Sequence, residues 1–159
     1  MSRTLTAETM AIVKASAPAL QQHGLSITKR MYERLFADPA IKSLFDQAAQ
    51  ASGAQPKRLA EAILAFARNV DKLDVLKPAI ERIATRHVAT HIKPQHYPAV
   101  AYALLAAIKD VLGDAADESV LAAWGEAYWF LADVLIAREA QIYAQDEAVM
   151  TAAMPMIQL

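Results

Sequence analysis

The stretch PAIERIATRHVATH, residues 78–91, decides the fold class of this chain. Its apolar positions recur at the spacing of one face of an α-helix. The residues on that face are Ile80, Ala84, His87, Val88 and His91. Lys93-Pro94 follows, and proline disfavours the helical conformation in the residue before it. We therefore expect a helix over 78–91 that carries histidine on its inward side.

Helical patterns continue on both sides of this stretch, and no segment shows the alternation of a half-buried strand. We expect an all-α domain of about seven helices. The expected elements before the stretch are a helix from Thr6 to Gly24, a helix over 26–37, a helical turn over 39–45, a loop over 46–54 and a helix with Pro56 at its first position. Those after it are a helix ending at Leu112 and a last helix capped by Asp117. Residues 1–145 are expected as the domain, and the Met- and Ala-rich residues 146–159 as a poorly ordered tail.

Composition excludes several classes of function. The 159 residues carry 16 basic and 17 acidic side chains, so there is no basic excess for binding nucleic acid. The absence of cysteine excludes disulfides, thiolate metal sites and cysteine nucleophiles. The N-terminus lacks the pattern of a signal peptide, and the most apolar stretch, residues 97–108, is too short to span a bilayer. These features predict a cytoplasmic protein without a transmembrane segment.

Motif searches leave histidine as the main candidate for chemistry. The sequence has no glycine-rich phosphate loop, no HExxH and no GxSxG. Of its four histidines, His23 is expected at a helix end and His96 in solvent at a helix start. His87 lies on the apolar stripe and must point inward, either as a hydrogen-bonded core residue or as a metal ligand. His91, one turn later on the same stripe, favours a metal site without deciding between the two.

Four further polar residues fall at inward positions: Tyr32, Gln55, Tyr97 and Glu139. Each has an ordinary structural role available. A tyrosine hydroxyl can bind a backbone carbonyl, Gln55 can cap a helix at the surface, and Glu139 can extend to water. Composition and periodicity do not choose between these roles and a binding site.

The order of these residues resembles that in the bacterial globins of the flavohaemoglobin family, in particular its single-domain members. The residues that carry the resemblance are Tyr32, Phe45, Gln55-Pro56, Leu59, His87, Tyr97 and Glu139. It extends over residues 5–145 and is clearest in the segments 23–36, 44–60, 96–118 and 123–143. The resemblance implies a globin fold around a non-covalent haem b.

The resemblance also implies a role for each residue. His87 is implied as the proximal iron ligand, with Glu139 and Tyr97 hydrogen-bonded to it and raising its basicity. On the other face, Tyr32 and Gln55 are implied to hold bound O2. The remaining residues implied at the cofactor are Phe45 as an aromatic wedge, Leu59 as an apolar gate, Arg86 as a propionate partner, Val88 beside His87, and Tyr97.

The function implied is reversible O2 binding, for storage or delivery in the cytoplasm. The alternative is nitric-oxide dioxygenation to nitrate. Because these 159 residues contain no reductase domain, that reaction is expected to need a separate flavin reductase. NO and CO are further expected ligands, and the chain is expected as a monomer or homodimer. A haem-based sensor and a haem-free helical scaffold stay open.

Three positions depart from the family pattern. His91 stands where glycine is common, and its side chain could contact a haem propionate. Met31 and Trp129 stand where phenylalanine and a small residue are expected, which changes the volume of the pocket.

Overall fold

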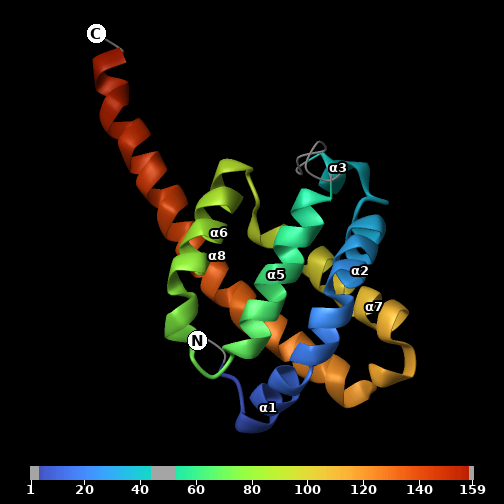
Figure 1. Ribbon diagram of the computed structural model, residues 1–159. Helices are drawn as coiled ribbons and strands as arrows, with labels where there is room; N and C mark the ends of the chain where they lie inside the picture. The colour runs from blue at the N-terminus through green and yellow to red at the C-terminus, as the bar shows by residue number, and fades with distance from the viewer. Residues whose placement is uncertain (1–3, 44–52, 158–159) are drawn as a thin grey trace.

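The computed structural model describes residues 4–43 and 53–157, and it contains seven α-helices and three short 3-10 turns (Figure 1). The helices are α1 (Ala7–Ala15), α2 (Ala17–Leu35), α3 (Pro39–Lys42), α5 (Ala54–Arg68), α6 (Lys77–Ala89), α7 (Tyr97–Leu112) and α8 (Glu118–Ile157). The turns are η1 (Leu73–Leu76), η2 (Pro94–His96) and η3 (Gly113–Ala115). No strand occurs in these ranges, so the predicted all-α class is confirmed.

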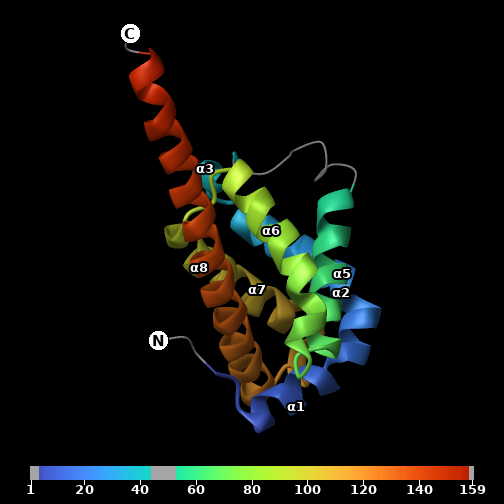
Figure 2. The ribbon, with the colours of Figure 1, turned by 90° about the vertical axis from the view of Figure 1, so that its left-hand side faces the viewer.

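The core forms where α2 crosses α5 and α7, and where α8 packs against α1, α6 and α7 (Figures 1 and 2). The largest of its fully buried side chains are Val13, Ile27, Thr28, Val70 and Ile108. Trp124 of α8 closes the lower end, with its ring 6.3 Å from that of Phe66 and its indole N–H donating to Ser16 Oγ at 3.0 Å. A large indole buried with its one donor satisfied stabilises this junction of α1, α5 and α8.

Two helix starts that the sequence marks are confirmed. Thr6 Oγ1 accepts a hydrogen bond from the backbone N–H of Thr9 at 3.1 Å, ahead of α1. Asp117 Oδ1 accepts one from the N–H of Val120 at 3.0 Å, ahead of α8. Each cap satisfies an N–H group that the first turn of a helix leaves without an internal partner.

The second helix differs from the prediction, because α2 runs without a break from Ala17 to Leu35 and includes Gly24. Gly24 is buried where α2 crosses α5, and a Cβ placed on it would lie 3.6 Å from the Cβ of Ala60. The glycine therefore allows two helices to approach closely and does not end one. His23, expected at a helix end, accordingly lies in the middle of α2.

The α3–α5 region agrees with the prediction in part. The turn expected over 39–45 is helical over Pro39–Lys42. Residues 44–52, which include Phe45 and most of the expected 46–54 loop, lie outside the described residues. The next helix, α5, begins two residues before Pro56, after Gly53 in the left-handed conformation with φ of 80°.

The end of α6 corrects the expectation for His91. The helix ends at Ala89, and His91 has a φ of 63°, so it lies beyond the helix and not on the stripe of His87. The N–H of His91 donates to the carbonyl of Val88 at 3.1 Å, and that of Ile92 donates to the carbonyl of His87 at 2.8 Å. These two bonds form a Schellman motif, which requires the left-handed residue.

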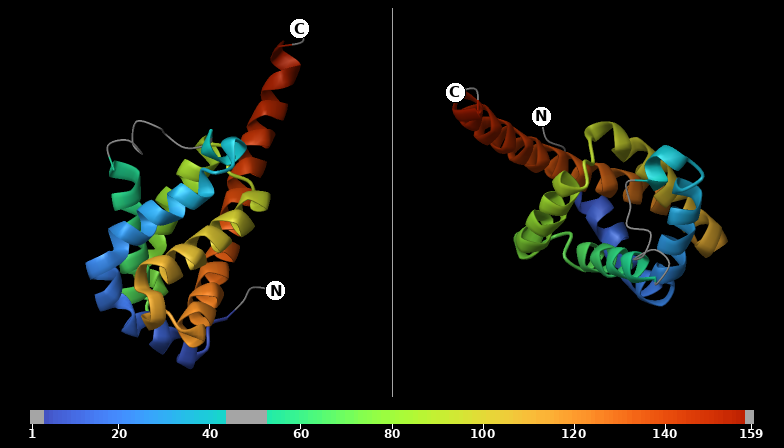
Figure 3. Two further views of the ribbon diagram at one scale, coloured as in Figure 1. Left: turned by 90° about the vertical axis from the view of Figure 1, so that its right-hand side faces the viewer. Right: turned by 90° about the horizontal axis from the view of Figure 1, so that it is seen from above.

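The last helix, α8, is the longest element and continues through most of the residues assigned to the tail (Figure 3). Its C-terminal part projects away from the other helices in every view (Figures 1 to 3). By length and composition alone, the segment 118–148 could cross a membrane, because an 18-residue window within it has a mean hydropathy of 1.4. The core helix of a globular protein passes the same test, and Trp124, Ala127 and Ala132 of α8 are buried inside the fold.

Candidate functional site

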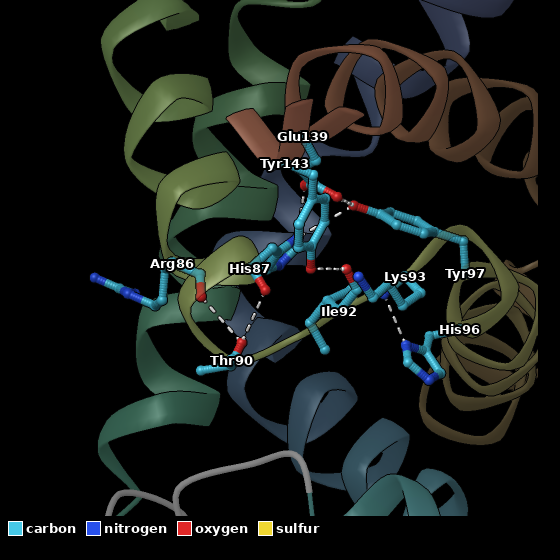
Figure 4. Close-up of polar contacts among 9 residues, drawn as sticks. All are labelled: Arg86, His87, Thr90, Ile92, Lys93, His96, Tyr97, Glu139 and Tyr143. Atoms are coloured by element: carbon cyan, nitrogen blue, oxygen red, sulfur yellow. Dashed lines mark hydrogen bonds and ion pairs between the residues drawn. The ribbon is translucent and has the colours of Figure 1, made fainter. Parts of the chain in front are cut away.

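The site begins with His87, in the last turn of α6, whose imidazole faces α7 and α8 (Figure 4). Its Nδ1 lies 2.9 Å from Oε2 of Glu139 and 3.1 Å from the hydroxyl oxygen of Tyr97. Tyr97 is the first residue of α7, and Glu139 lies in α8. Three residues far apart in the sequence, each of them predicted, are thus brought together by the last turn of α6, the start of α7 and the middle of α8.

Glu139 is a buried carboxylate, with only 3% of its surface exposed. The Tyr97 hydroxyl donates to both of its oxygens, at 2.8 and 2.9 Å. Burial, followed by the hydrogen bond to Glu139, raises the pKa of Tyr97 well above its ordinary value. Tyr97 therefore keeps its proton throughout the physiological range and remains a permanent donor to the carboxylate.

This network assigns the tautomer of a neutral His87. Because the Tyr97 proton points to Glu139, the Nδ1 of His87 is left to donate its own proton to Glu139 Oε2. The Nε2 atom then carries a lone pair, and it makes no hydrogen bond to any described residue. An imidazole fixed in this way presents Nε2 as a ligand for a metal ion.

Three other contacts hold the segment that follows His87, between α6 and the start of α7. The hydroxyl of Tyr128 donates to the carbonyl of Tyr97 at 2.7 Å, and that of Tyr143 donates to the carbonyl of Ile92 at 2.7 Å. The ammonium group of Lys93 lies 3.7 Å from the centre of the Tyr143 ring. Sequence reasoning missed Tyr128 and Tyr143 because their partners are backbone atoms, which every residue supplies.

The distal candidates lie on α2 and α5. Tyr32 is buried on α2, with its ring 5.4 Å from that of Phe36. Gln55 and Leu59, one turn apart on α5, are half-buried. The Thr28 hydroxyl, fully buried and not predicted, donates to the carbonyl of Pro56 at 2.9 Å. That bond fixes the start of α5, and with it Gln55, against α2.

The remaining candidates have separate outcomes. Val88 is buried beside His87 in α6. The Arg86 side chain is exposed and points away from the His87–Glu139 contact (Figure 4). His96 is half-buried, and its Nδ1 accepts a hydrogen bond from the N–H of Lys93 at 2.9 Å. Phe45 lies outside the described residues.

The arrangement of α5 and α6 fits a flat, apolar cofactor held through an imidazole. Each of the two packs closely on another helix, α5 on α2 and α6 on α8, but they do not pack closely on each other. Apolar side chains on both helices consequently stay only half-buried: Leu59, Ile63, Ile80 and Ile83. The His87 side chain keeps 30% of its surface exposed although it lies on the inner side of α6. A planar porphyrin would cover such a surface, and Nε2 of His87 would be available as a ligand for its iron.

An all-helical fold with a histidine held by a buried carboxylate is typical of one class of protein, the helical haem proteins. Comparison with known families identifies which family of helical haem proteins this is. The globin family model matches residues 29–135, about two thirds of the chain, and the chain belongs to the globin family.

Curated relatives place the chain within that family. It is 55% identical over 142 residues to a flavohemoprotein of Xylella fastidiosa, covering 89% of this chain and 36% of the relative. It is 46% identical over 143 residues to a flavohemoprotein of Halalkalibacterium halodurans, covering 89% of this chain and 35% of the relative. The chain thus spans about a third of the length of these relatives, the part that corresponds to their globin region.

Solved structures give the same relationship. An engineered carbene transferase derived from a putative nitric oxide dioxygenase of Rhodothermus marinus superposes with a TM-score of 0.83 at 43% identity, covering 89% of this chain and 97% of that one. A bacterial globin from Campylobacter jejuni has a TM-score of 0.82 at 38% identity, covering 87% and 99%. A flavohemoglobin of Malassezia yamatoensis with bound FAD and heme has a TM-score of 0.81 at 32% identity, covering 89% and 38%.

These comparisons confirm three predictions: the relation to the flavohaemoglobin family, the globin fold and haem as the cofactor. The carboxylate at His87 is the feature of this chain's own structure that bears most directly on what the haem does.

Proposed function

We propose that this chain binds haem through His87 Nε2 and binds O2 reversibly on the opposite face, with Tyr32 and Gln55 holding the ligand. The observation that supports this most is the commitment of Nδ1 to Glu139 at 2.9 Å, which leaves Nε2 as the one ring nitrogen able to act as a ligand. When bound, haem supplies the iron that takes up the gas and carries electrons. NO and CO are proposed as further ligands, and the cytoplasm as the location.

The protein's own residues have distinct tasks in this proposal. Glu139 accepts the Nδ1 proton and so raises the electron-donating strength of the imidazole. Tyr97 holds the carboxylate in place through both of its oxygens. On the distal side, the Tyr32 hydroxyl in a buried setting is a strong donor to a partly negative ligand, because a hydrogen bond gains strength where water is excluded.

Nitric-oxide dioxygenation is a second candidate, and the buried carboxylate at His87 favours it. In this reaction NO, O2 and one electron give nitrate, so each turnover needs an electron donor. A strongly donating proximal imidazole suits a site that activates O2 more than one that only stores it. The similarity to a putative nitric oxide dioxygenase of Rhodothermus marinus agrees with this candidate. The proposed donor is a separate flavin reductase.

Reconstitution with haemin tests the ligand assignment. The purified wild-type protein is expected to give a Soret band that shifts on dithionite reduction and sharpens with CO. The variant His87→Gly should lose this spectrum, and added imidazole should restore it by occupying the vacated position. His96→Gly is the matched control, and it should behave like the wild type. A His87→Gly spectrum that equals the wild type without imidazole would disprove the assignment.

Turnover separates the two functions. Oxygenated protein is mixed with NO in the presence of NADH and a flavin reductase, and nitrate is counted against haem. A dioxygenase is expected to form many nitrate ions per haem. The rate of nitrate formation should fall at least tenfold in Glu139→Gln. A single nitrate per haem with the reductase present would leave reversible O2 binding as the function.

A further inference from the structure

Positive charge is unevenly distributed along this chain. Residues 53–96, which form α5, η1, α6 and η2, contain eight Lys and Arg but only four Asp and Glu. The remaining residues contain eight basic and thirteen acidic side chains. Although the whole chain has a net charge of -1, residues 53–96 have a net positive charge. This basic segment includes α5 and α6, the two helices between which the haem is expected to bind.

The pairing of the arginines sharpens this contrast. Arg30 and Arg34 bind Asp110, and Arg138 binds Glu81. In contrast, the side chains of three arginines make no hydrogen bond or ion pair with any residue in the described ranges, and all three lie on α5 and α6. They are Arg58, Arg82 and Arg86. Lys57, also exposed and without such a contact, lies next to Arg58.

Three of these four residues, Lys57, Arg58 and Arg86, lie on helix ends at one end of the molecule, and Arg82 lies near the middle of α6. The N-terminal end of α5, which carries Lys57 and Arg58, and the C-terminal end of α6, which carries Arg86, lie at the same end of the fold (Figures 1 and 2). Arg82 is one turn before Arg86 and shares its face of α6. We call Lys57, Arg58, Arg82 and Arg86 the α5–α6 basic rim.

Glu81 does not neutralise the rim. Both of its oxygens are taken up by the Arg138 guanidinium of α8, at 2.7 and 2.8 Å. That bond holds the pKa of Glu81 below its ordinary value. Glu61 is exposed one turn after Lys57 on α5, and a bound haem would bring two carboxylates, so the four positive charges of the rim keep an excess of one.

We propose that the α5–α6 basic rim is the docking surface for the acidic face of the flavoprotein that delivers electrons to the haem. The inference rests on the proposed function, which needs an external electron donor close to the edge of the cofactor. Unpaired charges of one sign beside a redox centre attract a partner of the opposite sign and orient it during encounter. Because the rest of the surface is acidic on balance, such a partner is guided to this end of the molecule.

Stopped-flow reduction of the ferric, haem-loaded protein tests the docking surface. The donor is reduced flavodoxin, an acidic FMN protein, and photoreduced riboflavin serves as a small neutral donor. For the wild type, the second-order rate with flavodoxin should fall steeply as NaCl is raised from about 10 to about 300 mM. In Arg58→Glu/Arg82→Glu it should be about tenfold lower at low salt and nearly independent of salt.

The controls separate docking from other causes. Lys29→Glu on α2 reverses the charge of one exposed side chain outside the rim, half the charge change of the double variant, and it should leave the flavodoxin rate close to that of the wild type. The single variants Arg58→Glu and Arg82→Glu match it in charge, and each should lower the rate more than Lys29→Glu does. The riboflavin rate and the CO spectrum should be the same in all variants. Reversals at Arg86 are avoided, because this residue is also a candidate partner of the haem propionates.

Three results would overturn the proposal. One is an unchanged flavodoxin rate in Arg58→Glu/Arg82→Glu, and another is an equal loss in Lys29→Glu, which would reflect net charge alone. The third is binding to phosphatidylglycerol vesicles or duplex DNA that the double variant abolishes while its flavodoxin rate stays normal. A wild type that takes up no haem, or that riboflavin cannot reduce, would instead disprove the proposed function.

Discussion

Tyr97 is the residue that makes a buried carboxylate tolerable beside His87. It supplies the proton that both oxygens of Glu139 share, at 2.8 and 2.9 Å. Burying a carboxylate without donors costs several kcal/mol, so this hydroxyl contributes to the stability of the fold as well as to the geometry of the imidazole.

Tyr97→Phe removes that donor and keeps the ring. The free energy of unfolding is expected to fall by about 1–3 kcal/mol, because a buried acceptor loses its partner. Tyr143→Phe is the control, since among the described residues the hydroxyl of the half-buried Tyr143 binds the carbonyl of Ile92 and no carboxylate, and its loss should be the smaller. Urea denaturation of both variants measures the difference. Equal losses would contradict the special role given to Tyr97.

His91 carries backbone strain that a glycine would relieve. Its φ of 63° lies in the left-handed region, where a Cβ is unfavourable, and its side chain is exposed. His91→Gly is expected to raise the free energy of unfolding by up to about 1 kcal/mol. His91→Ala keeps the Cβ and should give no such gain. Thermal denaturation of the haem-loaded variants measures both, and a gain shared equally by the two would show that strain is not the cause.

The contact between His87, Tyr97 and Glu139 could be predicted from the sequence, because the resemblance to a family implies that these three side chains lie together. His87, Tyr97 and Glu139 do meet, as expected. Thr28 and Tyr128 could not be predicted in the same way. Each donates to a backbone carbonyl on another segment, and sequence does not reveal which carbonyl a particular packing brings within reach.

At the scale of the helices, the capped starts were predictable and the interior of α2 was not. A cap is a local interaction, because Thr6 and Asp117 each bind a backbone N–H only three residues further along the chain. Such a contact can be predicted from the sequence. The role of Gly24 depends on α5, which lies some thirty residues further on, and a glycine alone is read as a break.

Substitutions at Gly24 can show that it serves the α2–α5 contact. An alanine Cβ at this position would lie 3.6 Å from the Cβ of Ala60, in ordinary van der Waals contact, so Gly24→Ala should be tolerated or raise stability by up to about 1 kcal/mol. Gly24→Leu should force the helices apart and lower the free energy of unfolding by about 1–3 kcal/mol. Urea denaturation distinguishes these outcomes. If Gly24→Leu is as stable as Gly24→Ala, α5 can move away from α2 without loss of stability, and the close approach of the two helices is not required.

The contact between α2 and α7 includes an ion cluster that depends on pH. Asp110 on α7 accepts hydrogen bonds from Arg34 at 2.7 and 3.0 Å and from Arg30 at 2.8 Å. The side-chain hydrogen bonds from Arg34 and then Arg30 lower the pKa of Asp110 to about 2. A carboxyl with a lowered pKa stabilises the fold above its unfolded value, about 3.9, and loses that contribution as the pH falls towards 2.

Asp110→Asn should therefore be less stable than the wild type at pH 6, and the difference should shrink between pH 4 and pH 2. Urea denaturation at a series of pH values measures it. Asp114 is an exposed acid in η3, at the end of the same helix, and its side chain makes no hydrogen bond or ion pair with a described residue, so Asp114→Asn is the control for the loss of a carboxylate outside the cluster. A difference independent of pH would show that the cluster contributes through packing and not through charge.

At the scale of the whole molecule, α5 and α6 depend on what lies between them. Each is attached to another helix, but they do not pack closely on each other, and their facing apolar side chains stay half-buried. Removal of haem should therefore lower the melting temperature and raise amide hydrogen exchange first in α6. Haemin at about a thousand times its dissociation constant should restore about 4 kcal/mol. The apoprotein of His87→Gly should gain much less, and equal gains would place the haem elsewhere.

The family model ends at residue 135, whereas α8 continues to Ile157. This difference matters when a shortened form of the protein is designed for expression. Glu139 and Tyr143 lie beyond that boundary on the same uninterrupted helix. A fragment cut at residue 135 would retain His87 and Tyr97 and still match the family, but its histidine would lose the carboxylate acceptor. Boundaries taken from the family model alone would then give a shortened protein whose chemistry differs from that of the natural one.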